Sequence, residues 1–356
     1  AKQKLQELLK LNENMKFDVV LGNPPYQENN SERKRDDSIY HLFTDESYKL
    51  ANKVSLISPA RFLFNVGSTP VEWNKKMLND KHVKVVYYEE NSSIVFPGTD
   101  IKGGIVVMYR DKNKDFGAIG SFTIYPELNS ILKKVEIKSD LLNFGTLMFV
   151  QNKFNLEKLY NDFPELKERL GSQGKERRLT SSIFDLTPEL FSNKKSVTGN
   201  YTKIYGRQNN ERKYKIIKSD YLEQSENIAK YKVFVPAANG SGEFGEALSN
   251  PIIGEPQTGH TQTFISIGSF NTLYEAESML KYLKGKFSRA MLGVLKVTQN
   301  NKTKDVWSKI PLQDFKKNSD IDWTRPVPEI DQQLYKKYNL SKEEILFIEE
   351  KVKAMF

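Results

Sequence analysis

The sequence predicts an α/β fold: a partial Rossmann-like sheet of mostly parallel strands, followed by a second, α+β domain. Two observations carry this prediction. Short apolar runs alternate with amphipathic segments from residue 17 to about residue 110, which is the pattern of strands joined by helices. After about residue 145 the apolar runs shorten, Lys and Arg cluster, and Gly/Asn/Ser-rich stretches appear. We therefore expect one domain over residues 1–145 and another over residues 146–356.

The apolar runs of the first domain give its elements in order. We expect a strand at Phe17–Leu21, a helix at Asp37–Lys49, a strand at Val54–Ser58, a helix at Val71–Asn79, strands at Val83–Glu90 and Ile105–Tyr109, and a strand-like run at Phe122–Tyr125. Ligands of parallel sheets bind beyond the carboxyl ends of the strands. The residues directly after the first strand are therefore candidates for a functional site.

The second domain has fewer clear elements. Tyr274–Leu292 predicts a helix or a pair of helices, because its apolar residues recur at helical spacing. Ser341 and Glu344 have the spacing of a capping box. We therefore expect a terminal helix that begins at this point.

Composition excludes several classes of protein. The 356 residues include no Cys, which excludes disulfides, cysteine-zinc sites and thiol catalysis. Three scattered His disfavour a histidine metal site, and we expect no metal. No apolar run approaches the roughly 20 residues that span a bilayer, so no membrane partner is expected. The formal net charge of +9 favours an anionic partner such as nucleic acid.

The most informative motif is Asn23-Pro24-Pro25-Tyr26, directly after the apolar run 17–22. Proline lacks an N–H and fixes the turn, so nearby carbonyls stay free of local donors. The Asn23 side-chain oxygen and the Pro24 carbonyl can then accept from one NH2 group, while Tyr26 offers a ring for stacking. This is the equipment for methylating an amine held in a plane, such as the exocyclic nitrogen of adenine.

These four residues resemble motif IV of the S-adenosylmethionine-dependent amino-methyltransferases, in particular the gamma-class, Type IIG-like restriction-modification adenine-N6 enzymes. In that family an aromatic residue of motif VIII lies against the flipped adenine, and Phe96 stands at this position. The resemblance implies that both Tyr26 and Phe96 stack on the target base. Further segments are similar to that family, namely residues 36–43, 55–63, 95–107, 306–312 and 329–335.

The resemblance also implies the cofactor and the partners. S-adenosylmethionine is the expected methyl donor, and its main binding motif is expected upstream of Ala1. We therefore expect a fragment with little activity alone, which needs the missing N-terminal portion or a partner subunit. The expected substrate is double-stranded DNA, from which adenine is flipped. A bacterial, cytoplasmic and nucleoid-associated location follows from this reading.

The second domain is expected to be the target-recognition domain, with DNA-contacting candidates in three polar loops or turns. Arg, Gln and Asn side chains read guanine and adenine edges in the major groove. A solvated surface role is the alternative for each of these residues. The candidates are Arg207, Gln208, Asn209, Arg212, Lys213, Asn239, Asn300 and Lys302.

Several alternatives remain open at this point. The same motif occurs in methyltransferases of protein glutamine and of ribosomal RNA, which usually carry a smaller accessory region. The chain could instead be a non-catalytic DNA-specificity subunit. Glu127, Glu136 and Lys138 faintly resemble a nuclease metal site. Phe96 has a plain core role as its alternative.

Overall fold

The computed structural model describes residues 17–28, 37–64, 67–138, 143–172, 174–193, 200–296 and 298–355. The chain forms two compact units, Ala1–Asn129 and Ser130–Phe356. Both combine helices with strands, which confirms the predicted α/β fold with a second α+β part. None of the described helices is long and apolar enough to cross a membrane.

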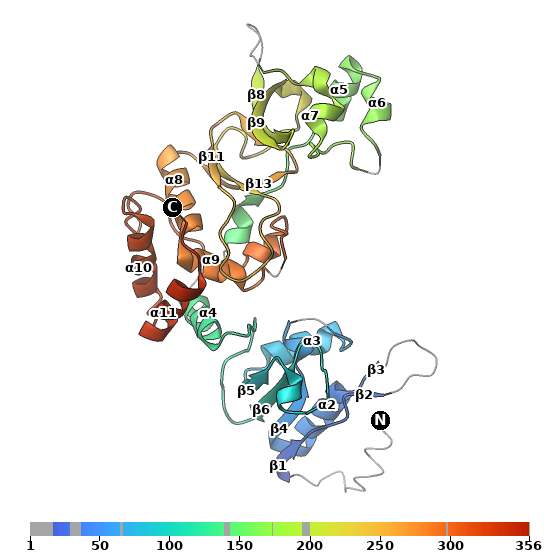
Figure 1. Cartoon of the computed structure of the whole chain (residues 1–356), viewed down its shortest axis with the longest axis vertical. Helices are drawn as coiled ribbons and strands as arrows, with labels where there is room; N and C mark the ends of the chain where they lie inside the picture. Colours follow the sequence, from blue (N-terminus) through green and yellow to red (C-terminus); the bar gives the residue numbers. More distant parts are fainter. Residues whose placement is uncertain are drawn as a thin grey trace. The chain divides into compact units, whose positions relative to one another are not determined.

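The N-terminal unit is built on a sheet with the strand order β1-β4-β6-β5 (Figure 1). The predicted helix Val71–Asn79 is present with these same bounds. Its described elements are β1 (Phe17–Gly22), β2 (Gln27–Glu28), β3 (Asp37–Ser38), α2 (Tyr40–Leu50), β4 (Ala51–Pro59), η1 (Ala60–Phe64), α3 (Val71–Asn79), β5 (Val83–Glu89), η2 (Ser92–Ile94), β6 (Ile105–Asp111) and α4 (Pro126–Lys138).

The sequence predicts a mostly parallel sheet, but this described sheet is mixed, because only one of its three strand pairings is parallel. β1 pairs parallel with β4, whereas β6 lies between β4 and β5 and is antiparallel to both. Two glycines with positive φ, Gly103 and Gly104, turn the chain into β6. The carboxyl ends of β1, β4 and β5 therefore share one edge of the sheet.

The core of this unit lies between the sheet and the helices. Trp73 and Met77, one helical turn apart on α3, are buried with Phe62, Val106 and Met108. This i, i+4 spacing is why the segment forms a helix that packs on the sheet. The arrangement holds the carboxyl ends of the strands in place.

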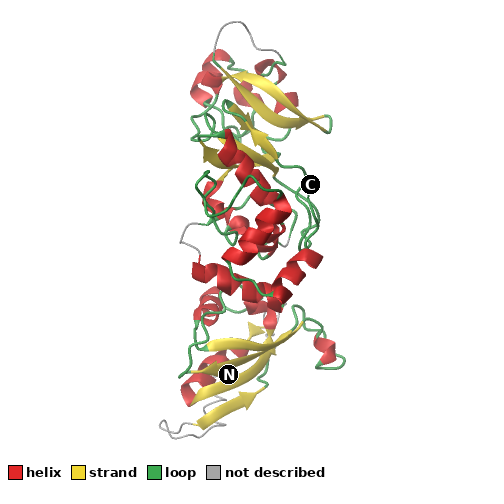
Figure 2. Ribbon diagram, turned by 90° about the vertical axis from the view of Figure 1, so that its left-hand side faces the viewer, coloured by secondary structure: helices red, strands yellow, loops and turns green. Residues whose placement is uncertain are grey.

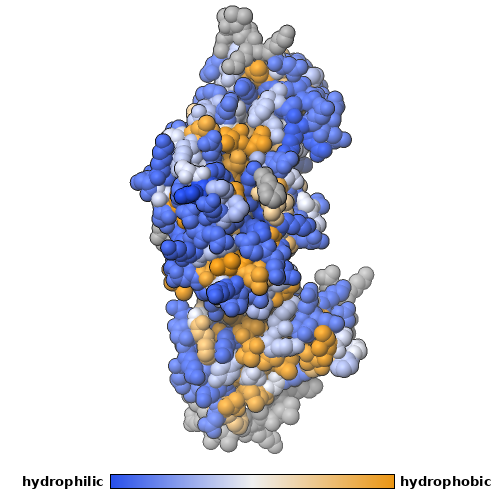
Figure 3. All heavy atoms as spheres, turned by 60° about the vertical axis from the view of Figure 1, so that its left-hand side comes forward, coloured by the Kyte–Doolittle hydropathy of each residue, from blue (hydrophilic) through white to orange (hydrophobic). Residues whose placement is uncertain are grey.

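β1 is the least covered strand of the sheet. Of the described strands it pairs with β4 alone. Phe17, Val19 and Leu21, which share one face because side chains alternate, are 40%, 45% and 73% exposed. Figure 3 shows apolar side chains gathered in patches on the surface of this unit. The strand that leads to the Asn-Pro-Pro-Tyr motif is thus held mainly from one side.

α4 contains the boundary between the two units, before the residue-145 boundary that composition predicts. Its second half is tied to the C-terminal unit by ion pairs. Lys134 pairs with Glu344, and Glu136 pairs with Lys309. The nuclease-like residue Glu136 is therefore engaged in a structural contact. In the described part of the chain, no group of three or more His, Cys, Asp or Glu could hold a metal ion.

The strand-like run Phe122–Tyr125 is not a strand, so this prediction is wrong. The side chain of Asn129 accepts from the Thr123 backbone N–H at 2.7 Å and donates to its carbonyl at 2.8 Å. The amide thereby satisfies the backbone groups that a neighbouring strand would otherwise pair with. The run instead leads into the first turn of α4.

The described part of the C-terminal unit contains two sheets, with the strand orders β11-β10-β13-β7 and β12-β8-β9. Figure 2 shows its long helices gathered in one region and its strands in another. The strands are β7 (Met148–Phe149), β8 (Tyr201–Gln208), β9 (Glu211–Lys218), β10 (Tyr231–Pro236), β11 (Ile252–Gly254), β12 (Thr258–His260) and β13 (Phe264–Phe270). The helices are η3 (Phe144–Leu147), α5 (Leu156–Asp162), α6 (Leu166–Arg169), α7 (Ile183–Leu186), η4 (Pro188–Leu190), η5 (Ser219–Tyr221), α8 (Leu273–Lys284), α9 (Lys286–Gly293), η6 (Lys304–Trp307), α10 (Val327–Lys337) and α11 (Lys342–Lys351).

Two helix predictions for this unit are confirmed. The segment Tyr274–Leu292 forms the pair α8 and α9, which meet at Gly285. Ser341 and Glu344 form the predicted capping box at the start of α11. Asp331 of α10 accepts from the backbone N–H groups of Lys286 and Phe287 at the start of α9. The long helices are thus joined by caps as well as by apolar contacts.

A buried lysine predicts that the stability of the C-terminal unit depends on pH. Lys232 of β10 is 1% exposed, and its amine donates to the carbonyls of Ile228, Glu255 and Thr258. Burial lowers the pKa of Lys232 to about 7, from 10.5 in an exposed lysine. Above pH 7 the unfolded chain therefore binds more protons than the folded chain, so the free energy of unfolding should rise with pH.

We expect the wild-type protein to gain stability between pH 7 and pH 9 relative to the variant Lys232→Met, which lacks the titrating amine. Urea unfolding followed by circular dichroism at both pH values measures this difference. Lys167→Met, at an exposed position of α6, is the control and should follow the wild type. Parallel pH profiles for wild type and Lys232→Met would contradict the prediction.

Candidate active site

The Asn-Pro-Pro-Tyr motif lies at the carboxyl edge of the sheet. It follows β1 directly, and β1 runs parallel to β4 with Gly22 opposite Leu56. The segment after β4, Pro59 to Arg61, therefore emerges at the same edge. The sheet thus brings two segments together that are about 35 residues apart in the sequence.

The motif residues differ in exposure. Asn23 and Pro25 are exposed, whereas Pro24 and Tyr26 are half-buried. Neither proline has an N–H that could occupy the neighbouring acceptors. The Asn23 side chain is thus exposed at the carboxyl edge of the sheet.

Tyr26 anchors the end of the motif. Its ring packs against the core of the N-terminal unit, and its carbonyl accepts from the Ile39 N–H at 3.1 Å. Burial raises the pKa of the Tyr26 hydroxyl, while the nearby Asn23 side chain lowers it. Among the described residues, no hydrogen-bond partner is found for this buried hydroxyl. The hydroxyl is thus a polar atom that a ligand could satisfy.

A cavity of about 120 Å³ lies beside Tyr26. The Ser38 hydroxyl on its wall is also buried without a hydrogen-bond partner among the described residues. Burial raises the pKa of Tyr40 on the same wall to about 12, so this tyrosine is neutral near pH 7. The lining residues are Tyr26, Gln27, Ser38, Tyr40, Pro59, Arg61, Gly67, Ser68, Asp100, Ile101 and Lys102.

Sequence reasoning assigned no role to most of these lining residues. Ser38, Tyr40, Arg61 and Asp100 lie in segments that resemble the methyltransferase family, but no chemical pattern marked them singly. Arg61 had one available signal, because it is a cation placed directly after a buried strand. Its neighbourhood with Tyr26 depends on strand pairing, which the sequence does not specify.

Phe96 lies in the loop between η2 and β6 and is half-buried. Its N–H donates to the Ser92 carbonyl at 2.8 Å. It does not line the cavity beside Tyr26, although Asp100 to Lys102 of the same loop do. Stacking of Phe96 on a target base stays a prediction.

Five of the predicted DNA-contacting residues come together on the β8–β9 hairpin. Asn209 lies at its turn, with a left-handed φ of 52°. Arg207 stands directly opposite Arg212, and Gly206 opposite Lys213. Like charges opposite each other in a sheet disfavour folding, so an anionic ligand would relieve a repulsion here.

The polar contacts of these residues are unequal. Arg207 is exposed. Arg212 donates to the carbonyls of Ser249 and Asn250 and lies over the Phe264 ring. The Gln208 amide donates to Asp185. Of the two arginines, Arg212 is thus the one held by contacts within the unit.

The other three candidates lie elsewhere in the C-terminal unit. Asn239 is 4% exposed, and its amide donates to the Ala247 carbonyl while accepting from Ser249. Asn300 and Lys302 are exposed and joined by a hydrogen bond from the Lys302 N–H to the Asn300 side chain. The Asn239 side chain thus fixes the loop internally, while the other two face solvent.

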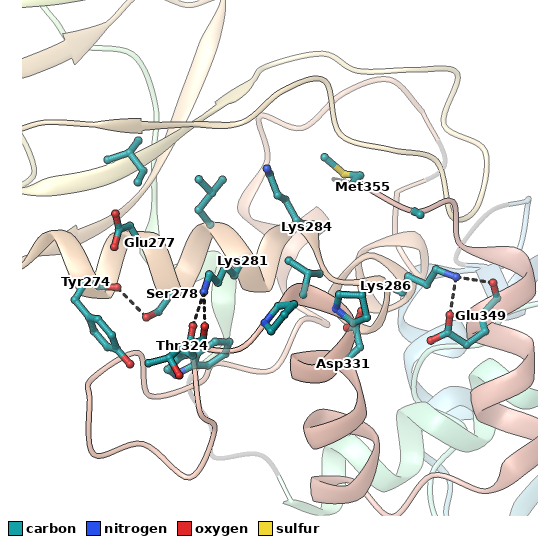
Figure 4. Close-up of a pocket in the computed structure, with 17 residues that line it drawn as sticks. Tyr274, Glu277, Ser278, Lys281, Lys284, Lys286, Thr324, Asp331, Glu349 and Met355 are labelled. Carbon is teal, nitrogen blue, oxygen red and sulfur yellow. Dashed lines mark hydrogen bonds and ion pairs between the residues drawn. The ribbon is translucent and has the colours of Figure 1, made fainter.

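A second cavity, of about 970 Å³, lies in the C-terminal unit among α8, α10 and the 323–328 segment (Figure 4). Its lysines are already engaged. Lys281 donates to the carbonyls of Trp323, Thr324 and Arg325, and Lys286 pairs with Glu349. These contacts hold the lysines within the unit, and the cavity beside Tyr26 is the better candidate site because it adjoins the Asn-Pro-Pro-Tyr motif.

The fold and the site define an α/β protein with a small cavity, partly lined by polar groups, at the carboxyl edge of its sheet. Residues 1–96 match the family model of the Eco57I restriction-modification methylase. This part of the chain is therefore similar to the restriction-modification methylases, as the motif resemblance predicts.

A curated relative and two solved structures are also similar to the chain. The relative is an uncharacterized adenine-specific methylase of Mycoplasma pneumoniae, 29% identical over 133 residues, which are 36% of this chain. The chain spans 31% of the length of that relative. The type IIG restriction endonuclease BpuSI is 12% identical, with a TM-score of 0.31 over 97% of this chain and 55% of that one. The Type IIL enzyme MmeI, solved in complex with DNA, is 9% identical, with a TM-score of 0.31 over 94% and 56%.

Proposed function

We propose that this chain contributes to site-specific methylation of the N6 amine of adenine in DNA, as part of a restriction-modification system. The observation that carries the proposal is the position of Asn23 to Tyr26 at the carboxyl edge of the sheet, beside a cavity with unpaired polar atoms. The family match over residues 1–96 supports the class of reaction. A cytoplasmic, nucleoid-associated location follows from this proposal.

The chemistry of the site acts on the amine. The adenine N6 lone pair is delocalised into the ring, so the nitrogen is a weak nucleophile. The Asn23 side-chain oxygen and the Pro24 carbonyl would accept its two hydrogens and favour a tetrahedral, reactive nitrogen. No titrating base is required before the attack, and the proton that the methylated nitrogen then releases would pass to solvent.

The target base must leave the duplex to reach Asn23. Extrusion costs a few kcal/mol of lost stacking and pairing. Stacking of the base on Tyr26 would recover roughly 1–3 kcal/mol of this extrusion cost. Phe96 is the second aromatic residue proposed to stack on the base. The half-buried ring of Tyr26 packs against the core, so its position would change little when the base binds.

The methyl donor proposed for this reaction is S-adenosylmethionine. The described residues hold no glycine-rich turn from a strand into a helix, which is the usual cradle of a nucleotide cofactor. The described residues are suited to binding the target amine, but they are not suited to binding S-adenosylmethionine. We therefore assign no residue of this chain to the cofactor and derive no step through it.

DNA recognition is proposed for the β8–β9 hairpin and for the exposed pair Asn300 and Lys302. Arg207 facing Arg212 supports an anionic ligand at the hairpin. Phosphate contacts make DNA binding fall steeply with salt. Binding of mixed-sequence duplex should therefore weaken strongly between 50 and 200 mM salt, by roughly tenfold for each few phosphates contacted.

The test is transfer of a tritiated methyl group from S-adenosylmethionine to duplex DNA, with this chain beside a version extended upstream. Label on adenine with the extended version alone supports the proposal and makes this chain its amine-binding and recognition part. Label on RNA or protein but not on DNA would support methylation of an amine, but it would show that DNA is not the substrate. No label on any of the three would overturn the proposed function.

Replacing Tyr26 by alanine should weaken binding of the extruded base by about 1–3 kcal/mol, because the stacking ring is lost. Saturation-transfer NMR with deoxyadenosine and this chain measures the change. Tyr26→Phe keeps the ring and should bind nearly as the wild type does. Tyr87→Ala, at a 43% exposed position of β5, is the control. Equal deoxyadenosine affinity in Tyr26→Ala and wild type would count against base stacking.

A further inference from the structure

Arg61 occupies a slot that two glycines form. A Cβ atom added to Gly103 would lie 2.9 Å from the Arg61 Cγ, and one added to Gly67 would lie 3.1 Å from its Cβ. Both glycines have positive φ, of 84° and 106°. Glycine is thus needed on both sides of the arginine stem, for space and for backbone conformation.

The guanidinium is fixed at one corner. Its Nε donates to the Lys102 carbonyl at 2.6 Å, across the edge of the sheet from the Asn-Pro-Pro-Tyr motif. Among the residues that the structure describes, no carboxylate forms an ion pair with it. The two Nη groups are therefore available for a bidentate contact with an oxyanion.

The residues around Arg61 favour a phosphate group as this oxyanion. Arg61 and Tyr26 line the same cavity of about 120 Å³. Lys102 adds a second cation to this wall and Asp100 a carboxylate, so positive charge is in excess. A nucleotide whose base lies on Tyr26 carries its own phosphates within one sugar of the base. A phosphate of that nucleotide is thus close at hand for Arg61.

We propose that Arg61 binds a phosphate of the extruded nucleotide and so positions its base beside Asn23 and Tyr26. The inference rests on the proposed function and adds a residue to it. Phosphate contacts fix register without reading sequence, so Arg61 serves every target adenine alike. The other oxyanion that the reaction offers is the carboxylate of S-adenosylmethionine, and the experiment separates the two.

The experiment compares the affinity of the full chain for deoxyadenosine and for deoxyadenosine 3′,5′-bisphosphate, by saturation-transfer NMR. The wild type should prefer the bisphosphate. Arg61→Ala should weaken bisphosphate binding by about tenfold, the value of one charge-assisted contact, and leave deoxyadenosine binding unchanged. Arg61→Lys should recover part of the preference. Gly103→Ala, which displaces the arginine stem, should lose the preference as Arg61→Ala does.

Lys75→Ala, which removes an exposed charge of α3, is the control and should keep the preference. Two results would overturn the inference while leaving the proposed function intact. In one, Arg61→Ala keeps the bisphosphate preference although Tyr26→Ala weakens binding of both ligands. In the other, Arg61→Ala lowers S-adenosylmethionine affinity and leaves the bisphosphate preference unchanged. Deoxyadenosine binding that neither Asn23→Ala nor Tyr26→Ala affects would overturn the proposed function itself.

Discussion

Replacing Asn23 by alanine is expected to lower methyl transfer to adenine by about 10²–10³-fold, the cost of removing one preorganised hydrogen-bond partner from a reacting group. The Asn23 amide is exposed at the end of β1, and in the proposed reaction it would supply one of two acceptors for the amine. With alanine, only the Pro24 carbonyl remains. Methyl transfer by the upstream-extended version measures the loss.

The loss should be confined to the chemical step. The β8–β9 hairpin lies in the other unit, so DNA affinity of Asn23→Ala should equal that of the wild type. Asn23→Asp keeps an acceptor oxygen and should retain more activity than alanine. Asn52→Ala, at an exposed position of β4, is the matched control. Turnover of Asn23→Ala close to the wild-type value would rule out the assigned role.

The second large effect concerns stability. Trp307 is completely buried, its indole N–H donates to the Asn301 carbonyl at 2.8 Å, and its ring stacks on Phe144. Trp307→Ala removes the ring and leaves a cavity, which costs about 3–5 kcal/mol in comparable cores. We expect this decrease in the free energy of unfolding of the C-terminal unit, measured by urea unfolding with circular dichroism.

The segment around Trp307 contacts the beginning of the C-terminal unit. The Phe144 N–H donates to the Ile310 carbonyl, and Asn143 forms an isolated bridge with Pro311. These contacts join chain segments about 165 residues apart. Leu346→Ala, at a 57% exposed position of α11, is the control and should change stability by less than about 0.5 kcal/mol. Equal stability of Trp307→Ala and the control would show that the ring is not a core anchor.

Local patterns predicted local structure well. The helix Val71–Asn79 needed only its i, i+4 apolar spacing, and the start of α11 needed only Ser341 and Glu344. Both depend on interactions within one turn. The motif at 23–26 was likewise located by the strand before it.

Pairings between distant segments were the part that sequence reasoning missed. Nothing in residues 105–111 indicates that β6 inserts antiparallel between β4 and β5. The Arg61 slot depends on that insertion, because Gly103 enters it from the turn before β6. Asn239 is a second example. The sequence suggests an exposed polar loop residue, but hydrogen bonds to Ala247 and Ser249 bury its side chain.

The one-sided support of β1 has a consequence for the motion of the site. Among the described strands β1 lies at the edge of the sheet, and an edge strand with three exposed apolar residues opens at lower free energy than a central strand such as β6. Its amide hydrogens should therefore exchange with solvent faster than those of β6. Each such opening carries Asn23 away from Arg61 while the rest of the sheet stays folded. Any contact that covers β1 would lengthen the time for which the two residues face the same ligand.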